Sequence, residues 1–498
     1  MSGIRDFYKN RSILITGGTG FMGKVLIEKI LTSIPDVGTI FVLVRPKKGL
    51  SPQERIEAML KKEPFTFNDI APNQFKKIIA IEADTSVENL GLNNTDRETI
   101  KNQVSVVMHF AASIRFDLPL LEAMKQNVLS LFNILNLCKE IKNIVSIIHL
   151  STTFCNIDVE CMEEKVYDFD NVDSPLETVK IVKMFSEKFK NDEVLLKKIE
   201  KSFIKPHPNT YTYTKRLAEI VARDMGNDLP IIIARPSIVL PSYKLPTPGW
   251  VDNLNGPMGI LTAAGKGVLR VLYANVDTYP QLIPVDVAIN GTLAIGWLRA
   301  KQKFEETPVY NITQGDLYKI TWREISEKAR VLAIKYPYKR FLWYPSGFAT
   351  SSFWLYTILS FFLHTIPAYF VDFLLVMFFQ KPFLVNIQQR LSLGMDLIAY
   401  FTLKNFKFLN EKVQKLHLVL SEEEQDIFYM SNKEYNIDEY ITKCFFGSRK
   451  YSLKNEDTND LLKSRIILNI CYIIDICIKI FFVYIGFKLI QTLLSGYK

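Results

Sequence analysis

Residues 13–23 read ILITGGTGFMG, and residues 24–31 read KVLIEKIL. A short β-branched apolar run meets a cluster of glycines, after which apolar residues recur at helical spacing. We therefore predict a strand, a tight turn and a helix. Gly18, Gly20 and Gly23 match the G-x-G-x-x-G spacing, in which glycines form the turn and let the backbone approach a pyrophosphate. The N-terminus of the helix then offers free N–H groups to the phosphates.

This stretch predicts a dinucleotide-binding turn, for which a purely structural turn is the alternative. Its place between a buried strand and an amphipathic helix favours the dinucleotide, because that is the context in which the glycine spacing binds a pyrophosphate. The residues expected to contact the dinucleotide are Gly17, Gly18, Thr19, Gly20, Phe21, Met22 and Gly23.

Length and composition indicate more than one domain and contact with lipid. A chain of 498 residues is too long for one small core. Apolar residues make up 48%, and the mean hydropathy of +0.08 is high for a soluble enzyme. The net charge is +9, but the lysines are spread along the chain without a basic arm. We therefore expect an anionic membrane surface or a phosphorylated small molecule as partner, and no nucleic acid.

Four further apolar runs read as strands of the same sheet, at residues 39–44, 78–83, 104–110 and 145–150. Continuous apolar runs are typical of parallel strands that are buried on both faces. Helical segments alternate with them, among them residues 120–138, while residues 157–205 read as a charged, solvated insertion. The pattern predicts an α/β fold with a doubly wound parallel sheet, whose ligands gather beyond the carboxyl ends of the strands.

The residues that follow these strands complete the expected cofactor site. Arg45 follows the second strand, where an acidic residue would hold the 2′-hydroxyl of NAD and an arginine would accept the 2′-phosphate of NADP. The arginine predicts NADP(H), and a solvated basic turn is the alternative. Asp84 follows the third strand, and Ala111 and Ala112 follow the fourth, where small side chains leave room for a flat cofactor.

Residues 209–219 read NTYTYTKRLAE, with a helical pattern in the second half. Tyr211 and Lys215 are four residues apart and so share a helix face. A phenol with a pKa near 10 is a poor acid at neutral pH, and a neighbouring ammonium lowers that pKa. With a hydroxyl from Thr152, at the end of the fifth strand, these residues predict a site for hydride transfer at a carbonyl. The alternative is an exposed tyrosine that is paired incidentally with a lysine.

Together the glycine turn, the Tyr211-x-x-x-Lys215 spacing and the Ser-Thr-Thr end of the fifth strand resemble the extended short-chain dehydrogenase/reductases. Within that superfamily the sequence is similar to the eukaryotic fatty acyl-CoA reductases, and most of all to insect-like members. The similarity covers nearly the whole chain. It continues through the segments RPSIV at 235–239, GWVDN at 249–253, GP at 256–257, IPVD at 283–286, PF at 382–383 and QQRL at 388–391.

The resemblance implies NADPH-dependent reduction of a long-chain acyl-CoA to a primary alcohol with release of CoA, through a hemithioacetal and an aldehyde. It assigns the catalytic roles to Tyr211 and Lys215, and Lys215 also contacts the cofactor. The hydroxyl role falls on Thr152, with Ser151 and Thr153 adjacent. A membrane-bound sterol or hydroxysteroid dehydrogenase of the same superfamily is one alternative, and a nucleotide-binding membrane scaffold without turnover is another. The histidines lie apart and form no H-E-x-x-H motif, so no metal is expected.

An apolar stretch at residues 353–379 is long enough to cross a bilayer, but His364, Pro367 and Asp372 interrupt it. Three interpretations fit this pattern: the stretch spans the membrane once, it forms a re-entrant or interfacial hairpin, or it is a helical pair buried in the second domain.

Residues 466–494 form a second apolar stretch, which we predict to be a membrane anchor. Asp475 and Lys479 are four residues apart within it and are expected to neutralise one another. Lys463 and Arg465 precede it, which by the positive-inside tendency leaves the catalytic domain in the cytosol.

The predicted organisation is a cofactor-binding domain at residues 1–345, a smaller helical domain at 346–450, a linker at 451–465 and the anchor at 466–494. The N-terminus shows no signal-peptide core, so we expect the first strand to fold in the cytosol. The endoplasmic reticulum is favoured over the peroxisome as the membrane. The six cysteines show no C-x-x-C pairing and are expected to be reduced thiols. Besides the acyl-CoA substrate and the membrane, a second copy of the chain, forming a homodimer, is a possible partner.

Overall fold

The computed structural model describes residues 3–46, 49–169, 174–314, 319–430, 436–454 and 461–495. Two residues of the predicted basic turn, Lys47 and Lys48, and much of the predicted linker lie outside these ranges. The chain divides into two compact units that are each discontinuous in sequence. Unit 1 comprises Met1–Val251, Pro280–Lys319 and Phe406–Asn436, and unit 2 comprises Asp252–Tyr279, Ile320–Asn405 and Ile437–Lys498. The domain boundaries predicted from the sequence stay predictions.

Unit 1 is built on a seven-stranded sheet with the order β11-β7-β5-β4-β1-β2-β3, in which every neighbouring pair is parallel. The strands are β1 Ser12–Thr16, β2 Ile40–Val44, β3 Ile78–Glu82, β4 Val104–His109, β5 Ser146–Leu150, β7 Ile231–Pro236 and β11 Val309–Ile312. The strand order reverses beside β1, which is the feature of a doubly wound sheet that places a ligand at its carboxyl edge. The predicted fold class is confirmed.

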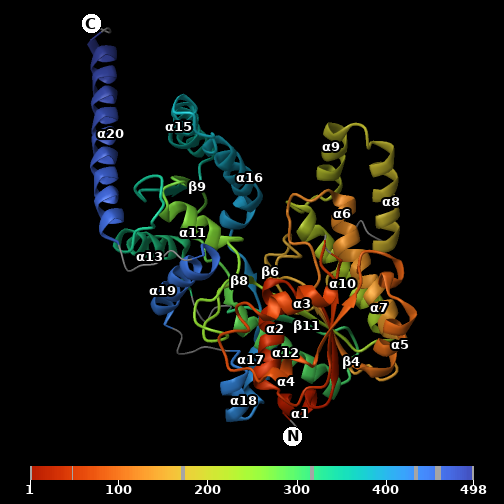
Figure 1. The fold of residues 1–498 in the computed structure, drawn as a ribbon. Helices are drawn as coiled ribbons and strands as arrows, with labels where there is room; N and C mark the ends of the chain where they lie inside the picture. The colour runs from red at the N-terminus through yellow and green to blue at the C-terminus, as the bar shows by residue number, and fades with distance from the viewer. Residues whose placement is uncertain are drawn as a thin grey trace. The chain divides into compact units, whose positions relative to one another are not determined.

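Helices cover both faces of this sheet (Figure 1). One face carries α2 Phe21–Ser33 and α12 Val285–Lys301, which contact one another. The other carries α5 Asn94–Gln103, α7 Ser130–Glu140 and α10 Thr210–Gly226. Strands β2 and β4 are buried along their whole length because both of their faces meet helices.

The remaining helices of unit 1 are shorter or lie outside these two layers. They are α1 Ile4–Tyr8, α3 Pro52–Leu60, α4 Pro72–Phe75, α6 Leu120–Met124, α8 Pro175–Lys188, α9 Glu193–Phe203, α17 Glu411–Leu418 and α18 Glu422–Ile427. Between α6 and α7 the chain makes a π-helical turn, η2 Lys125–Leu129. Short parallel pairs join β10 Leu282–Pro284 to β8 Ile238–Leu240, and β13 Lys407–Phe408 to β6 Cys161–Met162. The charged segment expected at 157–205 contributes α8 and α9.

Helix α10 begins one turn earlier than the sequence pattern indicated. The pattern became helical at Thr214, whereas the helix starts at Thr210 because the Asn209 side chain caps it and accepts the N–H of Thr212 at 2.9 Å. This earlier start brings Tyr211 into the first helical turn.

Unit 2 is mainly helical. Its helices are α11 Pro257–Gly265, α13 Trp322–Lys335, α14 Phe353–Ser360, α15 Ile366–Met377, α16 Leu384–Thr402, α19 Ile437–Gly447 and α20 Leu462–Ser495. A π-helical turn, η4 Phe361–Thr365, joins α14 to α15, and another, η5 Ser448–Ser452, follows α19. A short parallel pair joins β12 Phe348–Thr350 to β9 Val271–Tyr273.

Two helical segments of the described chain are long and apolar enough to cross a membrane, Phe353–Met377 and Leu462–Lys488. Few of their residues are buried inside the protein, and their large apolar side chains are exposed. The interpretation of residues 353–379 as a helical pair buried in the second domain is therefore wrong.

Candidate active site

The glycine turn joins β1 to α2 at the carboxyl edge of the sheet. Gly17 has a φ of +72°, and a Cβ atom there would lie 2.7 Å from the backbone nitrogen of Ala111. A Cβ atom on Gly23 would overlap the carbonyl oxygen of Gly17 and the Cα atom of Gly18. The turn therefore needs glycine at both positions, one for its left-handed backbone and one for close packing of helix on strand.

The N-terminus of α2 is left open toward that edge. Its N-cap is Gly20, which has no capping side chain, and the first turn of the helix holds no acidic residue. The N–H of Gly20 donates to the carbonyl of Gly17 at 2.9 Å, which closes the turn. Backbone N–H groups and a positive helix dipole at such an end suit a pyrophosphate. Phe21, the first residue of α2, stacks on Trp250 with ring centroids 5.5 Å apart. Thr19 lies in the turn, and Met22 is the second residue of the helix.

The end of β4 is held against this turn by the hydroxyl of Thr16. It accepts the N–H of Phe110 at 3.1 Å and the N–H of Ala111 at 3.0 Å, and it lies 2.9 Å from Nδ1 of His109. With two amides donating to it, the hydroxyl gives its own proton to Nδ1. The small residues Ala111 and Ala112 thus lie beside the glycine turn, where a flat cofactor was expected.

Arg45 and Asp84 lie at the carboxyl ends of β2 and β3. The side chain of Arg45 is exposed, and its backbone carbonyl accepts a hydrogen bond from Arg55. The carboxylate of Asp84 accepts the N–H of Ser86 at 2.9 Å and its hydroxyl at 2.7 Å. Both residues are on the edge that carries the glycine turn, and Asp84 also orders its own loop.

Tyr211, Lys215 and Thr152 come together where β5 ends. Lys215 is 3% exposed and its Nζ donates to the carbonyl of Leu150 at 2.7 Å. The hydroxyl of Thr152 lies close enough to the phenol of Tyr211 to lower its pKa, and the ring of Tyr211 stacks on Phe116 with centroids 5.7 Å apart. Of the three adjacent hydroxyl residues, Thr152 is the one that contacts the tyrosine.

Tyr213, the other tyrosine of the segment, is part of the core. It is 2% exposed and packs edge-on against Phe169, Phe203 and His207. Because it lies two residues from Tyr211 on a helix, its side chain points to a different side. The spacing argument therefore selected the tyrosine that lies at the strand end.

The electrostatics of Tyr211 differ from the expectation drawn from its lysine. Burial raises the pKa of Tyr211 above its usual value and the nearby thiol of Cys155 adds to this, while the hydrogen bond from Thr152 lowers it. The pKa of Lys215 is lowered to about 8, chiefly by burial, and the charge of Glu219 opposes that shift. A phenol that keeps its proton at neutral pH can donate it to an oxygen that is gaining charge.

A buried ion pair fixes the helix that carries these residues. Glu219 lies one turn after Lys215, and both carboxylate oxygens accept from Arg235 on β7, at 2.7 and 2.5 Å. The two side chains are 1% and 0% exposed. Arg235 also donates to the carbonyls of Glu163 and Lys165. The pair joins α10 to the sheet at the site, and breaking such a pair costs about 3–5 kcal/mol.

Asn127 connects three parts of the site, and no role was predicted for it from the sequence. It lies in the π-helical turn η2 and is 1% exposed. Its Oδ1 accepts the N–H of Ser113 at 2.8 Å, and its Nδ2 donates to the carbonyl of Ser113 at 3.2 Å and the hydroxyl of Thr214 at 2.9 Å. It thereby ties the loop after β4 to α10. A polar amide in an otherwise apolar helical pattern was the available signal.

A parallel sheet whose strand order reverses beside a glycine turn, with an open helix N-terminus at that turn, defines a dinucleotide-binding protein of the doubly wound class. Comparison with known families carries this further. The NAD-binding model of the male sterility proteins matches residues 15–292, and the Sterile model of the same proteins matches residues 363–455. The chain belongs to the fatty acyl-CoA reductase family, as its sequence motifs indicated, and it contains an NAD(P)-binding domain.

Individual relatives support this membership along most of the chain. The chain is 36% identical to fatty acyl-CoA reductase 1 of Xenopus laevis over 94% of its own length and 90% of the relative. It is 34% identical to fatty acyl-CoA reductase wat of Drosophila melanogaster, over 92% of its length and 87% of the relative. With fatty acyl-CoA reductase 2 of Homo sapiens the identity is 33%, over 92% and 87%.

Among solved structures, the terminal R domain of a myxalamid PKS-NRPS pathway superposes with a TM-score of 0.56 at 17% identity, covering 89% of this chain and 92% of that one. The reductase domain of a nonribosomal peptide synthetase from Mycobacterium tuberculosis superposes with a TM-score of 0.54 at 13% identity, with the same coverage. At these identities the likeness concerns the fold alone.

Proposed function

We propose that this protein reduces a long-chain fatty acyl-CoA to a primary fatty alcohol, with NADPH as reductant and release of CoA. The observation that carries the proposal is the meeting of Tyr211, Lys215 and Thr152 at the carboxyl end of β5, on the sheet edge that also carries the glycine turn. The membership of the chain in the fatty acyl-CoA reductase family supplies the substrate class.

The side chains present fit a dinucleotide at this edge. Cβ atoms on Gly17 or Gly23 would fill the space where the backbone of the turn lies close to its neighbours, and the open end of α2 suits the pyrophosphate. NADPH, when bound, supplies the hydride for each of the two reductions. Lys215, held by the carbonyl of Leu150, can donate its remaining N–H groups to the cofactor and keep a positive charge beside the phenol.

Tyr211 acts on the substrate oxygen in both reductions. When the thioester carbonyl is reduced, the phenol donates its proton to the developing oxyanion and a hemithioacetal results. Collapse of the hemithioacetal expels the thiol of CoA and leaves an aldehyde. The phenolate takes up a proton from solvent before the second reduction, in which the restored phenol protonates the aldehyde oxygen and gives the alcohol. The hydroxyl of Thr152 stabilises the phenolate between proton transfers by donating to it.

Arg45 supports the choice of NADPH over NADH. It directly follows β2, where a dinucleotide fold places the ribose of the adenosine, and its guanidinium is exposed and so free to reach a 2′-phosphate. Asp84, Ala111 and Ala112 are assigned to the adenosine and nicotinamide halves of the same site because they follow the neighbouring strands.

We also propose that α20 anchors the protein in a membrane, with unit 1 in the cytosol and the endoplasmic reticulum as the favoured membrane. An 18-residue window of the segment Leu462–Lys488 has a mean hydropathy of 2.4, and most apolar side chains of the segment are exposed. Removing residues from 464 onward should make the protein extractable from membranes by sodium carbonate, whereas the full-length chain should resist extraction. Cross-linking of the purified chain in detergent tests for a homodimer.

The activity is tested by incubating the full-length protein with palmitoyl-CoA and NADPH and following free thiol and lipid products together. The proposal expects free CoA and hexadecanol, with two NADPH consumed for each alcohol formed. A sterol dehydrogenase would release no thiol, and a nucleotide-binding scaffold would consume no NADPH. Absence of thiol release across acyl chain lengths would overturn the proposal.

A further inference from the structure

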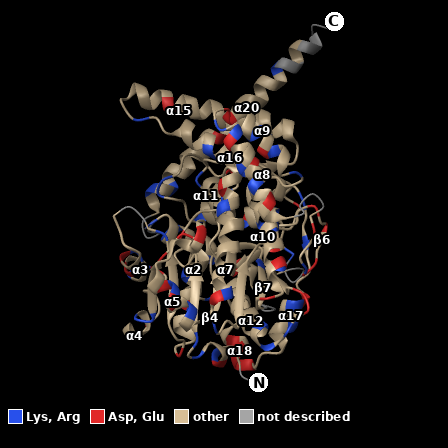
Figure 2. Ribbon diagram, turned by 90° about the vertical axis from the view of Figure 1, so that its right-hand side faces the viewer, with Lys and Arg blue, Asp and Glu red and all other residues tan. Residues whose placement is uncertain are grey.

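One side of the helical segment formed by α14, η4 and α15 is an exposed apolar surface. Its members include Trp354, Phe361, Phe362, Phe370, Phe373 and Met377, each more than half exposed. We call this surface the α14–α15 apolar face. In the charge-coloured view α15 is almost free of charged residues (Figure 2). A soluble protein rarely leaves so many large apolar side chains uncovered in one place.

The opposite side of the same segment holds its ionisable groups. His364 is 6% exposed, and its Nε2 accepts the N–H of Arg270 at 2.8 Å and the N–H of Val271 at 3.2 Å. Its Nδ1 lies 3.2 Å from the hydroxyl of Ser360. The π-helical turn η4 carries His364, and the extra residue in such a turn redirects the side chain toward the start of β9.

Asp372 of α15 caps the next helix. It is 8% exposed, and its carboxylate accepts the backbone N–H groups of Phe383, Leu384 and Val385 at 3.0, 2.9 and 2.9 Å. These are the N–H groups at the start of α16, which would otherwise lack partners. His364 and Asp372, which interrupted the apolar stretch in the sequence, are therefore both used to bind backbone of unit 2.

This sidedness distinguishes a helix that lies on a bilayer from one that crosses it. A crossing helix meets hydrocarbon or other spans over its whole circumference, and each polar group in hydrocarbon needs a partner there. Here one side is committed to backbone groups of β9 and α16, while the other side is apolar and uncovered. A helical segment with one apolar and one polar side lies in the interfacial layer.

Arg270, which directly precedes β9, also binds α20. The guanidinium of Arg270 donates to Asp475 of α20 at 3.0 Å, while the N–H of Arg270 donates to His364. Asp475 is 2% exposed and also accepts the indole N–H of Trp343 at 2.8 Å and pairs with Lys479 at 2.6 Å. The expected neutralisation of Asp475 by Lys479 is thereby confirmed. One residue thus ties both uncovered apolar elements of unit 2 together, so a single apolar phase can cover both.

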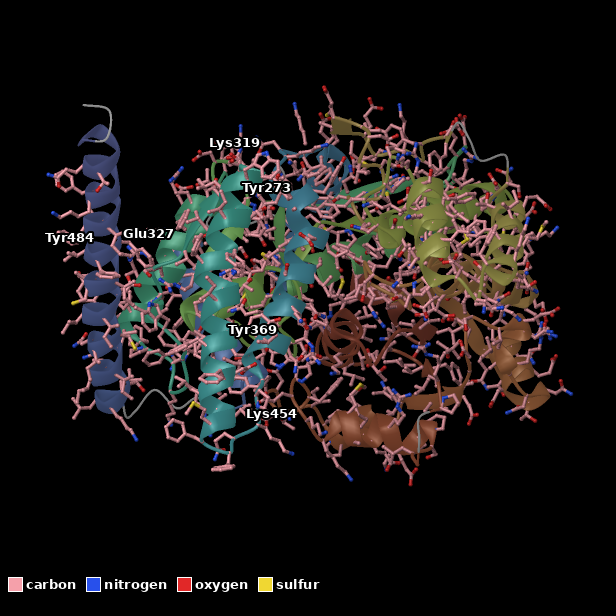
Figure 3. All side chains as sticks on the ribbon, turned by 90° about the horizontal axis from the view of Figure 1, so that it is seen from above. Tyr273, Lys319, Glu327, Tyr369, Lys454 and Tyr484 are labelled. Atoms are coloured by element: carbon pink, nitrogen blue, oxygen red, sulfur yellow. The ribbon has the colours of Figure 1, made fainter. Side chains whose placement is uncertain are left out.

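We propose that the α14–α15 apolar face lies in the surface layer of the lipid bilayer without crossing it, so that both ends of the segment stay on the cytosolic side. This inference rests on the proposed anchoring by α20. Tyr369 on α15 and Tyr484 on α20 mark the two elements in Figure 3, and both side chains are more than half exposed.

The test uses the full-length chain in sealed microsomes, with the exposed thiol removed by Cys477→Ser. Ser351→Cys and Gln380→Cys place one thiol at each end of the segment, at exposed positions. Both should react with a membrane-impermeant maleimide without permeabilisation. If only one of them reacts until the microsomes are opened, the segment crosses the bilayer and the proposal is wrong.

A second pair of variants tests whether lipid covers the face. Phe370→Cys lies on it, and Glu327→Cys on α13 is the exposed control within the same unit. Membranes should slow labelling of Phe370→Cys at least about tenfold relative to detergent, which corresponds to about 1.4 kcal/mol, and should leave Glu327→Cys within about twofold. Equal labelling of Phe370→Cys in membranes and in detergent overturns the proposal. Protection that persists in detergent and rises with protein concentration also overturns it, because that result indicates that a second protein covers the face.

Failure of this inference is distinguishable from failure of the proposed function. Thiol release from palmitoyl-CoA reports the activity, and resistance to carbonate extraction reports the anchor. If both are present while the flanking thiols lie on opposite sides, only the interfacial placement is wrong. If the full-length chain does not associate with membranes at all, the anchoring and the interfacial placement are overturned together.

Discussion

Helices α12 and α20 are both apolar on most sides, but they meet different surroundings. Helix α12 in unit 1 is buried from Val285 to Leu298, where it packs on the sheet beside α2. Helix α20 in unit 2 leaves most of its described apolar side chains exposed. Each contains one aspartate that is 2% exposed, Asp286 in α12 and Asp475 in α20. An apolar helix without a polar face needs an apolar environment on all sides, and in α20 the protein does not supply it.

The contrast extends to what the buried polar groups do. In unit 1 the buried polar groups lie at the carboxyl edge of the sheet, where Lys215 and Thr152 lie near the phenol of Tyr211. In unit 2 they bind backbone and hold helices, as His364 and Asp372 do. We therefore expect substitutions in the first set to change the reaction and those in the second set to change helix docking or membrane contact.

The largest effect is expected for Tyr211→Phe. Loss of the proton donor should lower the rate of thiol release about 10²–10⁴-fold, while NADPH affinity, thermal stability and membrane association stay close to those of the wild type. Steady-state assays and quenching of protein fluorescence by NADPH provide the measurements. Thr153→Ser is the control, since it alters a neighbouring hydroxyl residue that is not bonded to the phenol. Full activity in Tyr211→Phe would falsify the site assignment.

Next in size is the difference between Asp286→Ala and Asp475→Ala. Asp286 accepts the N–H groups of Tyr243, Lys244 and Leu245 at 2.9, 2.7 and 3.0 Å, inside the protein. Its loss should lower the free energy of unfolding by about 3 kcal/mol. Asp475→Ala should cost less, about 1–2 kcal/mol. Its partner Lys479 is 58% exposed and can turn to solvent, so mainly Arg270 and the indole N–H of Trp343 lose an acceptor inside the protein. Thermal unfolding of both variants in detergent measures the difference, and equal losses would break the comparison.

A smaller effect on the pH profile is expected for Glu219→Gln. Burial lowers the pKa of Lys215 to about 8, and the negative charge of Glu219 raises it. Without that charge the pKa falls further, and Lys215 holds its proton only at pH values below its pKa. The alkaline loss of kcat/KM should therefore begin about one pH unit lower than in the wild type.

The control for this variant is its thermal stability, since Glu219 also pairs with the buried Arg235. A lowered midpoint of unfolding with an unchanged alkaline limb would make Glu219 a structural partner only. The double variant Glu219→Gln with Arg235→Gln removes both charges and should recover stability, while the shift of the alkaline limb remains.

The smallest effect is expected for Arg45→Ala. Since the guanidinium is exposed, its ion pair with a 2′-phosphate is worth about 1 kcal/mol, or about fivefold in affinity. The KM for NADPH should rise by that factor while the KM for NADH stays unchanged. Arg323→Ala removes an exposed arginine of unit 2, which pairs with Asp277, and serves as the control. An equal change for both cofactors would remove the argument for NADPH.

Much of the fold and part of the site could be predicted because their signals are local. The glycine turn, the buried strands and the four-residue spacing of Tyr211 and Lys215 all depend on residues that are close in sequence. Asn127 could not be predicted, since its contacts with Ser113 and Thr214 join segments that are distant in the chain. The direction of the pKa shift of Tyr211 was also missed, because burial depends on what packs around the ring.

The sequence by itself determined the parallel α/β sheet, the dinucleotide turn, the helical spacing of Tyr211 and Lys215, and the presence of two long apolar segments, because periodicity and spacing are properties of the local chain. Only the tertiary structure decided which hydroxyl contacts Tyr211, which ion pair holds α10 to β7, and on which side of α14 and α15 the polar groups lie. The physical reason is that hydrogen bonds and burial depend on distances between side chains, and the fold sets those distances for residues that are far apart in sequence.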